Sequence, residues 1–351
     1  MAEAAASVED MVPAGPLAAF LDEALGDEAL GAAAAGHQPV HVTKIGQGRS
    51  NLTFRVRRGG CSYVLRRPPL GELPETAHDM MREYRVLAAL VGTRVRAPRV
   101  VVACQDSAVL GVPFYLMEVV DGIVIRDTLP DGFDVPSRAG LGYEMVDALA
   151  ELHTTDHVAA GLAALGRPAG YTTRQVARWT KQWAVMQTRP VPDIEAVRDW
   201  LNDNLPTGSR AAVVHGDYKM DNVVFAPGAP ARLRAILDWE MATLGDPLAD
   251  LGYLMMFWPQ QGEELIEGLA PPTRLPGMAQ RAELLARYEE RTGFAMTDLT
   301  FYRTLALWKL AILSEGLYKR HLAGKADSPW FAALERSVPV MAARARSWCG
   351  A

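Results

Sequence analysis

The chain has 351 residues, of which 49% are hydrophobic and 22% are charged, and its formal net charge is −5. These proportions are ordinary for a soluble globular protein, and the length suits one large domain or two smaller lobes. The weakly acidic balance gives no support to nucleic-acid binding as the main role, so we expect no nucleic-acid partner.

The three cysteines lie far apart at positions 61, 104 and 349 and form no Cys-x-x-Cys pair, which is typical of free thiols in a reducing cytoplasm. The first ten residues are acidic and lack the basic and apolar segments of a secretory signal. No run approaches the ~18 apolar residues of a membrane span. The sequence therefore predicts a cytoplasmic protein without a membrane association.

The first third of the chain predicts an antiparallel sheet with one helix on its face. A lead-in helix is expected over 16–35, and a second helix is expected over 74–91. Alternating apolar residues and a Gly59-Gly60 turn indicate a β-meander. The expected strands cover 40–45, 52–56, 61–66, 99–104 and 112–120. The order is β-β-β-α-β-β, and such an arrangement is an α+β lobe.

A glycine-rich loop, Gly46-Gln47-Gly48-Arg49-Ser50-Asn51, joins two of these strands. A dinucleotide-binding fingerprint needs a helix after its glycines, whereas a strand follows here. A hairpin folded over phosphates fits better, with Gly46 and Gly48 allowing close approach and the N–H groups up to Asn51 donating to phosphate oxygens. An ordinary hairpin turn is the alternative interpretation.

After Asp121-Gly122 the chain is mainly helical, so we place a boundary between an N-terminal lobe, 1–121, and a C-terminal lobe, 122–351. Ser137 is the expected N-cap of a helix that ends near His153. Further helices are predicted near 173–188, 193–204, 247–258, 278–292, 297–323 and 328–348.

Short apolar runs flank a polar loop between Val213 and Asp250. Asp217, Asn222 and Asp238 stand where these short strands end, so we expect them to point at a shared cleft. Two carboxylates and an amide are typical of a magnesium–phosphate site, in which one carboxylate is left to orient an attacking hydroxyl.

The segment His215-Gly216-Asp217-x-Lys219-x-x-Asn222 resembles the catalytic loop of the aminoglycoside/choline phosphotransferase branch of the protein-kinase-like superfamily. Ile236-Leu237-Asp238-Trp239-Glu240 and Gly245-Asp246-Pro247-x-x-Asp250 are similar to the metal-binding segment of that branch. The resemblance covers most of the chain and implies a bilobal fold. The motifs Gly-x-Ser-Asn-Leu-Thr-Phe, Tyr-Val-Leu-Arg-Arg-Pro-Pro and Leu-Tyr-Lys-Arg-His-Leu resemble phosphotransferase domains fused to, or encoded near, acyl-CoA dehydrogenases.

This resemblance implies the chemistry of the loop. Asp217 is the expected base, Lys219 neutralises the γ-phosphate, and His215 braces the loop by hydrogen bonds. Asn222 and Asp238 are the expected Mg²⁺ ligands. We expect His153 to be a core or supporting residue and Asp250 to accept from N–H groups of the catalytic loop. Glu240 is either a contact of a second metal or a surface carboxylate.

The resemblance also implies an ATP site in the N-terminal lobe. Its expected residues are Gly46, Gly48, Ser50, Asn51, Arg66, Glu83, Glu118 and Val120, the last two in the hinge that binds adenine through backbone groups. The superfamily usually has Lys where this chain has Arg66. Arg keeps the charge and adds a planar donor group, so an Arg66–Glu83 pair is feasible. Arg67, on the opposite strand face, is expected to point to solvent.

The predicted function is therefore ATP- and Mg²⁺-dependent transfer of the γ-phosphate to a hydroxyl of a small molecule, with a hydroxyacyl or CoA-linked compound as the expected acceptor. An aminoglycoside-type kinase, a protein kinase and an inactive nucleotide-binding protein are the alternatives. The chain lacks an Ala-Pro-Glu segment after Asp238, which argues against a protein kinase. Mixed charges in the later helices argue against a polycationic acceptor. The oligomeric state is left open.

Overall fold

The computed structural model describes residues 7–29, 38–46, 51–69, 79–208, 210–260, 262–263, 271–325 and 328–350. These residues form two compact units. The first contains the described residues up to Gly92, together with Ala97–Asp121 and Leu237–Glu240, and the second contains the remainder. Two short segments, Thr93–Arg96 and Leu237–Glu240, thus group with the unit on the other side of residue 121 in the sequence.

The first unit is built on a five-stranded antiparallel sheet in the order β1-β2-β3-β5-β4. The strands are β1 (Val40–Ile45), β2 (Leu52–Arg58), β3 (Cys61–Arg67), β4 (Val100–Cys104) and β5 (Phe114–Glu118). The predicted succession of strands along the chain and their antiparallel pairing are confirmed. The short helix α4 (Ser107–Leu110), between β4 and β5, was not predicted because four residues show no helical period.

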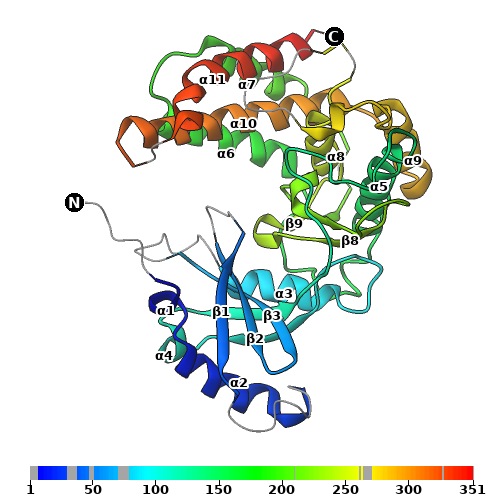
Figure 1. Ribbon diagram of the computed structural model, residues 1–351. Helices are drawn as coiled ribbons and strands as arrows, with labels where there is room; N and C mark the ends of the chain where they lie inside the picture. The colour runs from blue at the N-terminus through cyan, green and yellow to red at the C-terminus, as the bar shows by residue number, and fades with distance from the viewer. Residues whose placement is uncertain are drawn as a thin grey trace. The chain divides into compact units, whose positions relative to one another are not determined.

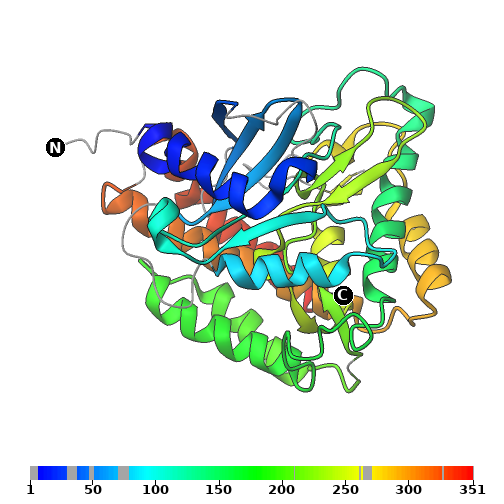
Figure 2. The same cartoon turned by 90° about the horizontal axis from the view of Figure 1, so that it is seen from below.

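Helices cover both faces of this sheet (Figures 1 and 2). Helix α3 (Met80–Leu90) packs on β4 and β5, and α1 (Val8–Met11) and α2 (Ala14–Ala29) pack on the face that carries Phe54 and Leu65. The expected helices over 16–35 and 74–91 are confirmed in their described parts, and residues 30–37 and 70–78 lie outside the described residues. Asp79 caps α3 by accepting from the N–H of Arg82 at 2.9 Å.

Arg67 does not point to solvent, so that prediction is wrong. Its side chain is only 2% exposed, and its guanidinium donates to the backbone carbonyls of Met11 and Leu110. Arg66, the preceding residue of β3, faces the opposite side of the sheet, where its side chain pairs with Glu83 of α3. The lead-in segment, through Met11, and α4, through Leu110, therefore supply the acceptors that allow a charged residue to be buried there.

The second unit is mainly helical. Its helices are α5 (Ala139–His153), α6 (Tyr171–Met186), α7 (Pro192–Asp203), α8 (Leu248–Met256), α9 (Arg281–Thr292), α10 (Leu299–Leu322) and α11 (Pro329–Trp348). The long helix α10 contacts α6, α7, α8 and α11 (Figure 1). All seven predicted helices of this region are present. Ser137, however, is not the N-cap of α5, because it lies in the short 3-10 helix η1 (Val135–Ser137) and its hydroxyl donates to the carbonyl of Asp134.

Two small antiparallel pairs hold the loop between the helices of this unit. Strand β6 (Ala212–Val214) pairs with β9 (Thr243–Gly245), and β7 (Val223–Phe225) pairs with β8 (Leu233–Ile236). The polar loop from His215 to Asn222, which ends in the 3-10 helix η2 (Met220–Asn222), runs from β6 to β7. The pairing fixes both ends of the loop. Strand β9 was not predicted, because three residues are too few for an alternation signal.

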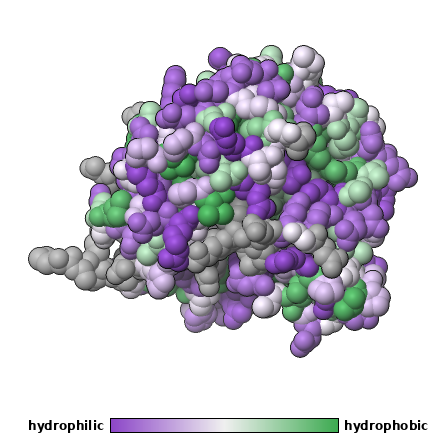
Figure 3. Space-filling view, turned by 90° about the horizontal axis from the view of Figure 1, so that it is seen from above, coloured by the Kyte–Doolittle hydropathy of each residue, from purple (hydrophilic) through white to green (hydrophobic). Residues whose placement is uncertain are grey.

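The face shown in Figure 3 is mostly hydrophilic, and its hydrophobic side chains gather in small patches. Within the described residues, no helix combines the length and the hydropathy needed to cross a membrane. The remaining short elements, the 3-10 helices η3 (Trp239–Met241) and η4 (Pro272–Arg274), lie in connecting segments.

Candidate active site

Asp250, which is 1% exposed and lies in the first turn of α8, forms hydrogen bonds with the start of the loop. One carboxylate oxygen accepts from the N–H of His215 at 2.6 Å, and the other accepts from the N–H of Gly216 at 2.8 Å. Burial opposes the charge of Asp250, but the donors around it, with His153 foremost, hold its pKa below the usual value. The predicted role of Asp250 as acceptor for the loop is confirmed.

Two histidines complete this support. His153, at the end of α5, is buried, and its ring nitrogens lie 3.3 Å from the Asp250 carboxylate and 2.6 Å from the Tyr288 hydroxyl. His215 is also buried, and its Nδ1 accepts from the N–H of Asp217 at 3.3 Å. His215 therefore braces the loop by a hydrogen bond, as expected, and His153 is a buried residue that supports the loop through Asp250, also as expected.

Gly216 adopts a left-handed conformation with φ of 89°. A Cβ at this position would lie 2.9 Å from the Cβ of Met241 and 3.0 Å from its carbonyl oxygen. The close approach and the positive φ both require glycine at this point, so the His-Gly-Asp turn is fixed by sterics as well as by hydrogen bonds.

The Asp217 carboxylate is surrounded by donors. The Tyr253 hydroxyl of α8 donates to Oδ1 at 2.5 Å, the Asn222 amide donates to Oδ2 at 2.7 Å, and the Lys219 ammonium lies 3.3 Å from Oδ2. Three donors fix the orientation of the carboxylate. The side chain retains 23% exposure, so the group is held in place and is still accessible to a ligand.

Asn222 and Lys219 are fixed by the same carboxylate. The Asn222 amide nitrogen also donates to the Asp217 carbonyl at 2.9 Å, which leaves the Asn222 side-chain oxygen as the atom available to a cation. The Lys219 ammonium lies 3.7 Å from Asp221 as well, so it is shared between two carboxylates. The second unit thus brings four predicted residues together: His215, Asp217, Lys219 and Asn222.

Asp238 lies in the first unit with Arg66 and Glu83. The Arg66 guanidinium donates to Asp238 at 2.9 Å, and its Nε lies 3.3 Å from Glu83, so the predicted Arg66–Glu83 pair is present. Burial raises the pKa of Glu83, as do Asp238 and Glu240, while Arg66 opposes the shift. Burial lowers the pKa of Arg66, but the surrounding Glu83, Tyr115 and Asp238 raise it more, so Arg66 is charged. The Arg66 side chain therefore neutralises two acidic groups at once.

The segment 237–240 has an unusual backbone. Asp238 adopts φ of 66°, a left-handed conformation that is uncommon for residues other than glycine. The N–H of Trp239 donates to Glu83 at 3.1 Å, and the carboxylate of Glu240 accepts from the Asn51 amide at 2.8 Å. Glu240 is thus a half-buried carboxylate engaged by Asn51, which is 4% exposed.

The remaining residues of the expected ATP site are placed as follows. Gly46 has φ of 76°, which only glycine adopts readily, while Gly48 and Ser50 lie outside the described residues. Glu118 ends β5, where its backbone N–H donates to the Arg99 carbonyl at 2.9 Å and its carboxylate accepts from Arg99. Val120 follows in a half-buried position outside any strand.

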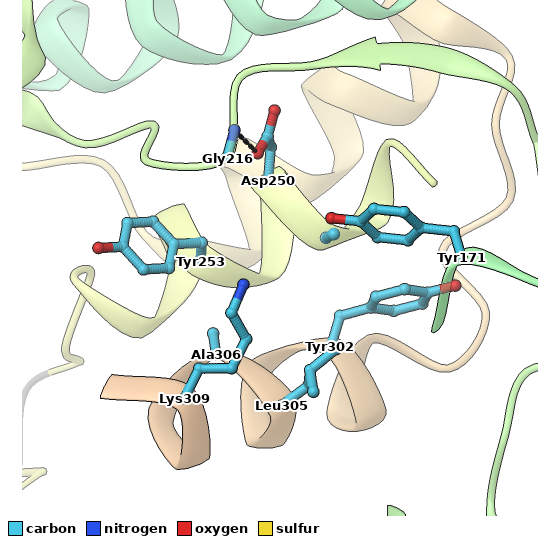
Figure 4. A pocket seen from close by; sticks show the side chains of 9 residues that line it. Tyr171, Gly216, Asp250, Tyr253, Tyr302, Leu305, Ala306 and Lys309 are labelled. Carbon is cyan, nitrogen blue, oxygen red and sulfur yellow. Dashed lines mark hydrogen bonds between the residues drawn. The ribbon is translucent and has the colours of Figure 1, made fainter. Parts of the chain in front are cut away.

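A narrow pocket lies directly beneath the loop, with room for about one water molecule. It is shown in Figure 4, and its walls include Gly216, Asp250 and Tyr253 on one side and Tyr302 and Lys309 on the other. Tyr253 and Lys309 were not predicted as site residues. A signal existed for Tyr253, because a residue three positions after Asp250 lies on the same face of a helix.

The sequence pattern of the phosphotransferase enzyme family matches residues 41–302. The chain belongs to this family. The expected family is thereby confirmed, and the matched region includes every residue of the loop described above.

Several relatives and solved structures are similar to this phosphotransferase-family chain. It is 33% identical over 321 residues to acyl-CoA dehydrogenase family member 10 of Mus musculus. The aligned region covers 90% of this chain and 29% of the relative. It is 36% identical over 294 residues to family member 11 of Rattus norvegicus, covering 82% of the chain and 37% of the relative. The chain thus spans about a third of the length of these curated relatives.

Solved structures of the same family share the fold. A candidate aminoglycoside phosphotransferase from Ralstonia eutropha superposes with a TM-score of 0.80 at 32% identity, covering 95% of this chain and 97% of that one. The aminoglycoside phosphotransferase APH(4)-Ia, solved with AMP-PNP and hygromycin B, has a TM-score of 0.60 at 16% identity and covers 95% of this chain and 99% of that one. The predicted kinase-like α+β fold is confirmed.

Proposed function

We propose that this chain is an ATP- and Mg²⁺-dependent phosphotransferase that moves the γ-phosphate to a hydroxyl group of a small molecule, with Asp217 as the base. The observation that carries the proposal is the Asp217 carboxylate itself. It is oriented by Tyr253, Asn222 and Lys219, it is partly exposed, and it stands on a loop whose backbone is fixed by a buried aspartate.

Phosphoryl transfer requires the protein mainly to position the reactants and to neutralise charge. The Asp217 carboxylate would accept a hydrogen bond from the acceptor hydroxyl, orient its oxygen, and take its proton as the bond to phosphorus forms. The Lys219 ammonium, 3.3 Å from this carboxylate, stabilises its negative charge and is close enough to meet a phosphate oxygen presented there.

The donor set fits magnesium. Within the described residues there is no cluster of three or more histidine, cysteine or acidic side chains of the kind that makes an all-protein metal site. Magnesium does not need one, because it usually binds through one or two carboxylates or amides, with phosphate oxygens and water completing the shell. The Asn222 oxygen and the Asp238 carboxylate are the proposed protein ligands. Magnesium, when bound, would neutralise phosphate charge.

The nucleotide would be held by the first unit. The Arg66–Glu83–Asp238 contacts provide a buried cation of fixed orientation, and Arg66 supplies a planar donor group in place of the usual lysine. Gly46 is proposed to lie near the phosphates, together with Gly48, Ser50 and Asn51, and the backbone at Glu118 and Val120 to bind the adenine. Complexes of APH(4)-Ia with AMP-PNP support a nucleoside triphosphate as donor.

Two observations support the proposed class of acceptor molecule: the names of the relatives and the salt bridges formed by two acidic residues of the second unit. Relatives that carry acyl-CoA dehydrogenase names favour a hydroxyacyl or CoA-linked acceptor. Glu263 is bound by Arg281 at 2.9 Å and Glu315 by Arg189 at 3.3 Å, so neither carboxylate is free to pair with an amine of an aminoglycoside. Both pairs argue against the aminoglycoside-kinase alternative.

The test is phosphate transfer by the purified chain. With ATP, Mg²⁺ and a panel of hydroxyacyl-CoAs, hydroxy acids and aminoglycosides, we expect ATP consumption and a phosphorylated hydroxyacyl or hydroxy-acid product seen by mass spectrometry. Chelation by EDTA should abolish transfer, and added Mg²⁺ should restore it. Nucleotide binding without transfer to any compound would instead support the inactive nucleotide-binding alternative.

A further inference from the structure

Lys309 lies in α10, and its side chain projects into the pocket beneath the catalytic loop (Figure 4). The opposite walls of the pocket belong to the loop itself and to α8, through Gly216, Asp250 and Tyr253. Tyr253 joins the pocket to the proposed base, because its hydroxyl donates to Asp217 at 2.5 Å. Tyr253 therefore contacts Asp217 and lines the same pocket as the cationic Lys309.

Within the described part of the chain, the Lys309 ammonium forms no ion pair and no hydrogen bond with another side chain or carbonyl. Its close aromatic neighbour is Trp179, whose ring centroid lies 5.5 Å away. The nearby acidic groups are already engaged, Asp250 by two backbone N–H groups and His153, and Asp217 by Tyr253, Asn222 and Lys219. The half-buried Lys309 ammonium thus has no counter-ion among the described residues.

A cation in this setting is unfavourable unless something else binds it. Burial lowers the pKa of Lys309 to about 8; Asp250 and Asp217 partly oppose the shift, and the nearby cation Arg178 adds to it. At pH 7 about nine molecules in ten therefore still carry the charge. A leucine or methionine at this position would avoid the cost, which indicates that the charge has a use.

We propose that Lys309 binds the carboxylate of an anionic hydroxy-acid acceptor while Asp217 receives the hydroxyl of the same molecule. This inference rests on the proposed function and adds the class of acceptor. The pocket holds about one water molecule, so only a terminal oxygen of the carboxylate would enter it and the carbon chain would lie outside. An ammonium without another partner would bind such an oxygen by a charge-assisted hydrogen bond.

The experiment measures acceptor binding, so that its result does not depend on turnover. Affinities of short hydroxy acids and of the corresponding hydroxy amides are measured by calorimetry with Mg²⁺ and a non-hydrolysable ATP analogue present. The variants are Lys309→Met, Lys309→Arg and the matched control Lys319→Met, a lysine of the same helix whose ammonium donates to the Val185 carbonyl at 2.6 Å. Circular dichroism checks that each variant is folded.

The wild type should bind the hydroxy acids more tightly than the amides, by on the order of tenfold to a hundredfold, the range of one charge-assisted hydrogen bond. Lys309→Met should remove this preference, whereas Lys309→Arg and Lys319→Met should keep it. The inference is overturned if the wild type shows no preference, or if Lys309→Met keeps it. Transfer activity on the same compounds tests the proposed function separately.

Discussion

Replacing Asp250 with asparagine tests the support of the catalytic loop with almost no change in volume. Asp250 presents one oxygen to the N–H of Gly216 and the other to the N–H of His215, with His153 at 3.3 Å from the second oxygen. Asparagine has a single side-chain oxygen. Its NH₂ group must therefore face one of two backbone N–H groups, neither of which can accept a hydrogen bond.

The magnitude follows from these contacts. A hydrogen bond to a charged group contributes about 1.5–3 kcal/mol, and a buried donor left without an acceptor costs about 1–3 kcal/mol. The surroundings hold the pKa of Asp250 below its usual value, so the charge itself is favourable there and is also lost. We therefore expect Asp250→Asn to lower the free energy of unfolding of the second unit by roughly 3–5 kcal/mol.

Asp246→Asn is the matched control. Asp246 is also buried, but it accepts from the N–H of Leu248 at 3.1 Å and from the hydroxyl of Tyr302 at 2.8 Å. An asparagine oxygen can serve Leu248 while its NH₂ donates to Tyr302, because a hydroxyl can also accept. Burial raises the pKa of Asp246, so loss of its charge is not a penalty. We expect a cost below about 1 kcal/mol.

The assay is chemical unfolding at pH 7, followed by the fluorescence of tryptophans such as Trp258 and Trp308, which are fully buried in the second unit. Asp250→Asn should unfold at a clearly lower denaturant concentration than Asp246→Asn. Equal stability of the two variants would refute the argument that the two backbone donors make Asp250 irreplaceable.

Three further predictions concern the loop and the pocket. Gly216→Ala should lower the free energy of unfolding by about 2–4 kcal/mol in the same assay, because alanine at φ of 89° is strained and its Cβ would crowd Met241; wild-type stability would mean that the loop rearranges freely. Tyr253→Phe should lower kcat for phosphate transfer by about tenfold or more and leave the KM for ATP unchanged, since it removes the 2.5 Å hydrogen bond to Asp217 without changing the ring; an unchanged kcat would show that the bond does not orient the base. Lys309→Met should be more stable than the wild type by on the order of 1–2 kcal/mol at pH 7. This difference should shrink as pH rises from about 8 towards 10.5, because the unfolded chain binds the lysine proton more tightly than the folded one. A difference that does not depend on pH would contradict a charged lysine whose pKa is lowered in the folded chain.

Much of the fold could be predicted because its signals are local. The succession of strands along the first unit follows from alternation and the Gly59-Gly60 turn. The apolar stripe of α5 lies on residues that are all fully buried, Leu141, Met145, Leu149 and Leu152. The motif from His215 to Asn222 is also local, since β6 and η2 fix its two ends within a few residues.

The features that were missed depend on contacts between distant residues. Arg67 is buried because Met11 and Leu110, 56 and 43 positions away, supply carbonyl acceptors. Segment 237–240 groups with the first unit through Arg66 and Glu83, which lie more than 150 positions earlier. In the sequence, nothing distinguishes Lys309 from the other basic residues of its long helix. It lies beneath the loop because α10 packs against α8.

The most direct test of the central claim compares Asp217→Asn with Asp221→Asn. Both residues are partly exposed carboxylates near the Lys219 ammonium, at 3.3 Å and 3.7 Å, but only Asp217 is also held by Tyr253 and Asn222. Initial rates of phosphate transfer should fall by about 10²–10⁴-fold in Asp217→Asn, the range of a lost general base, with nucleotide affinity unchanged. Asp221→Asn should stay within about tenfold of the wild type, on the scale of an exposed ion pair. Full activity of Asp217→Asn, or equal losses in both variants, would contradict Asp217 as the base.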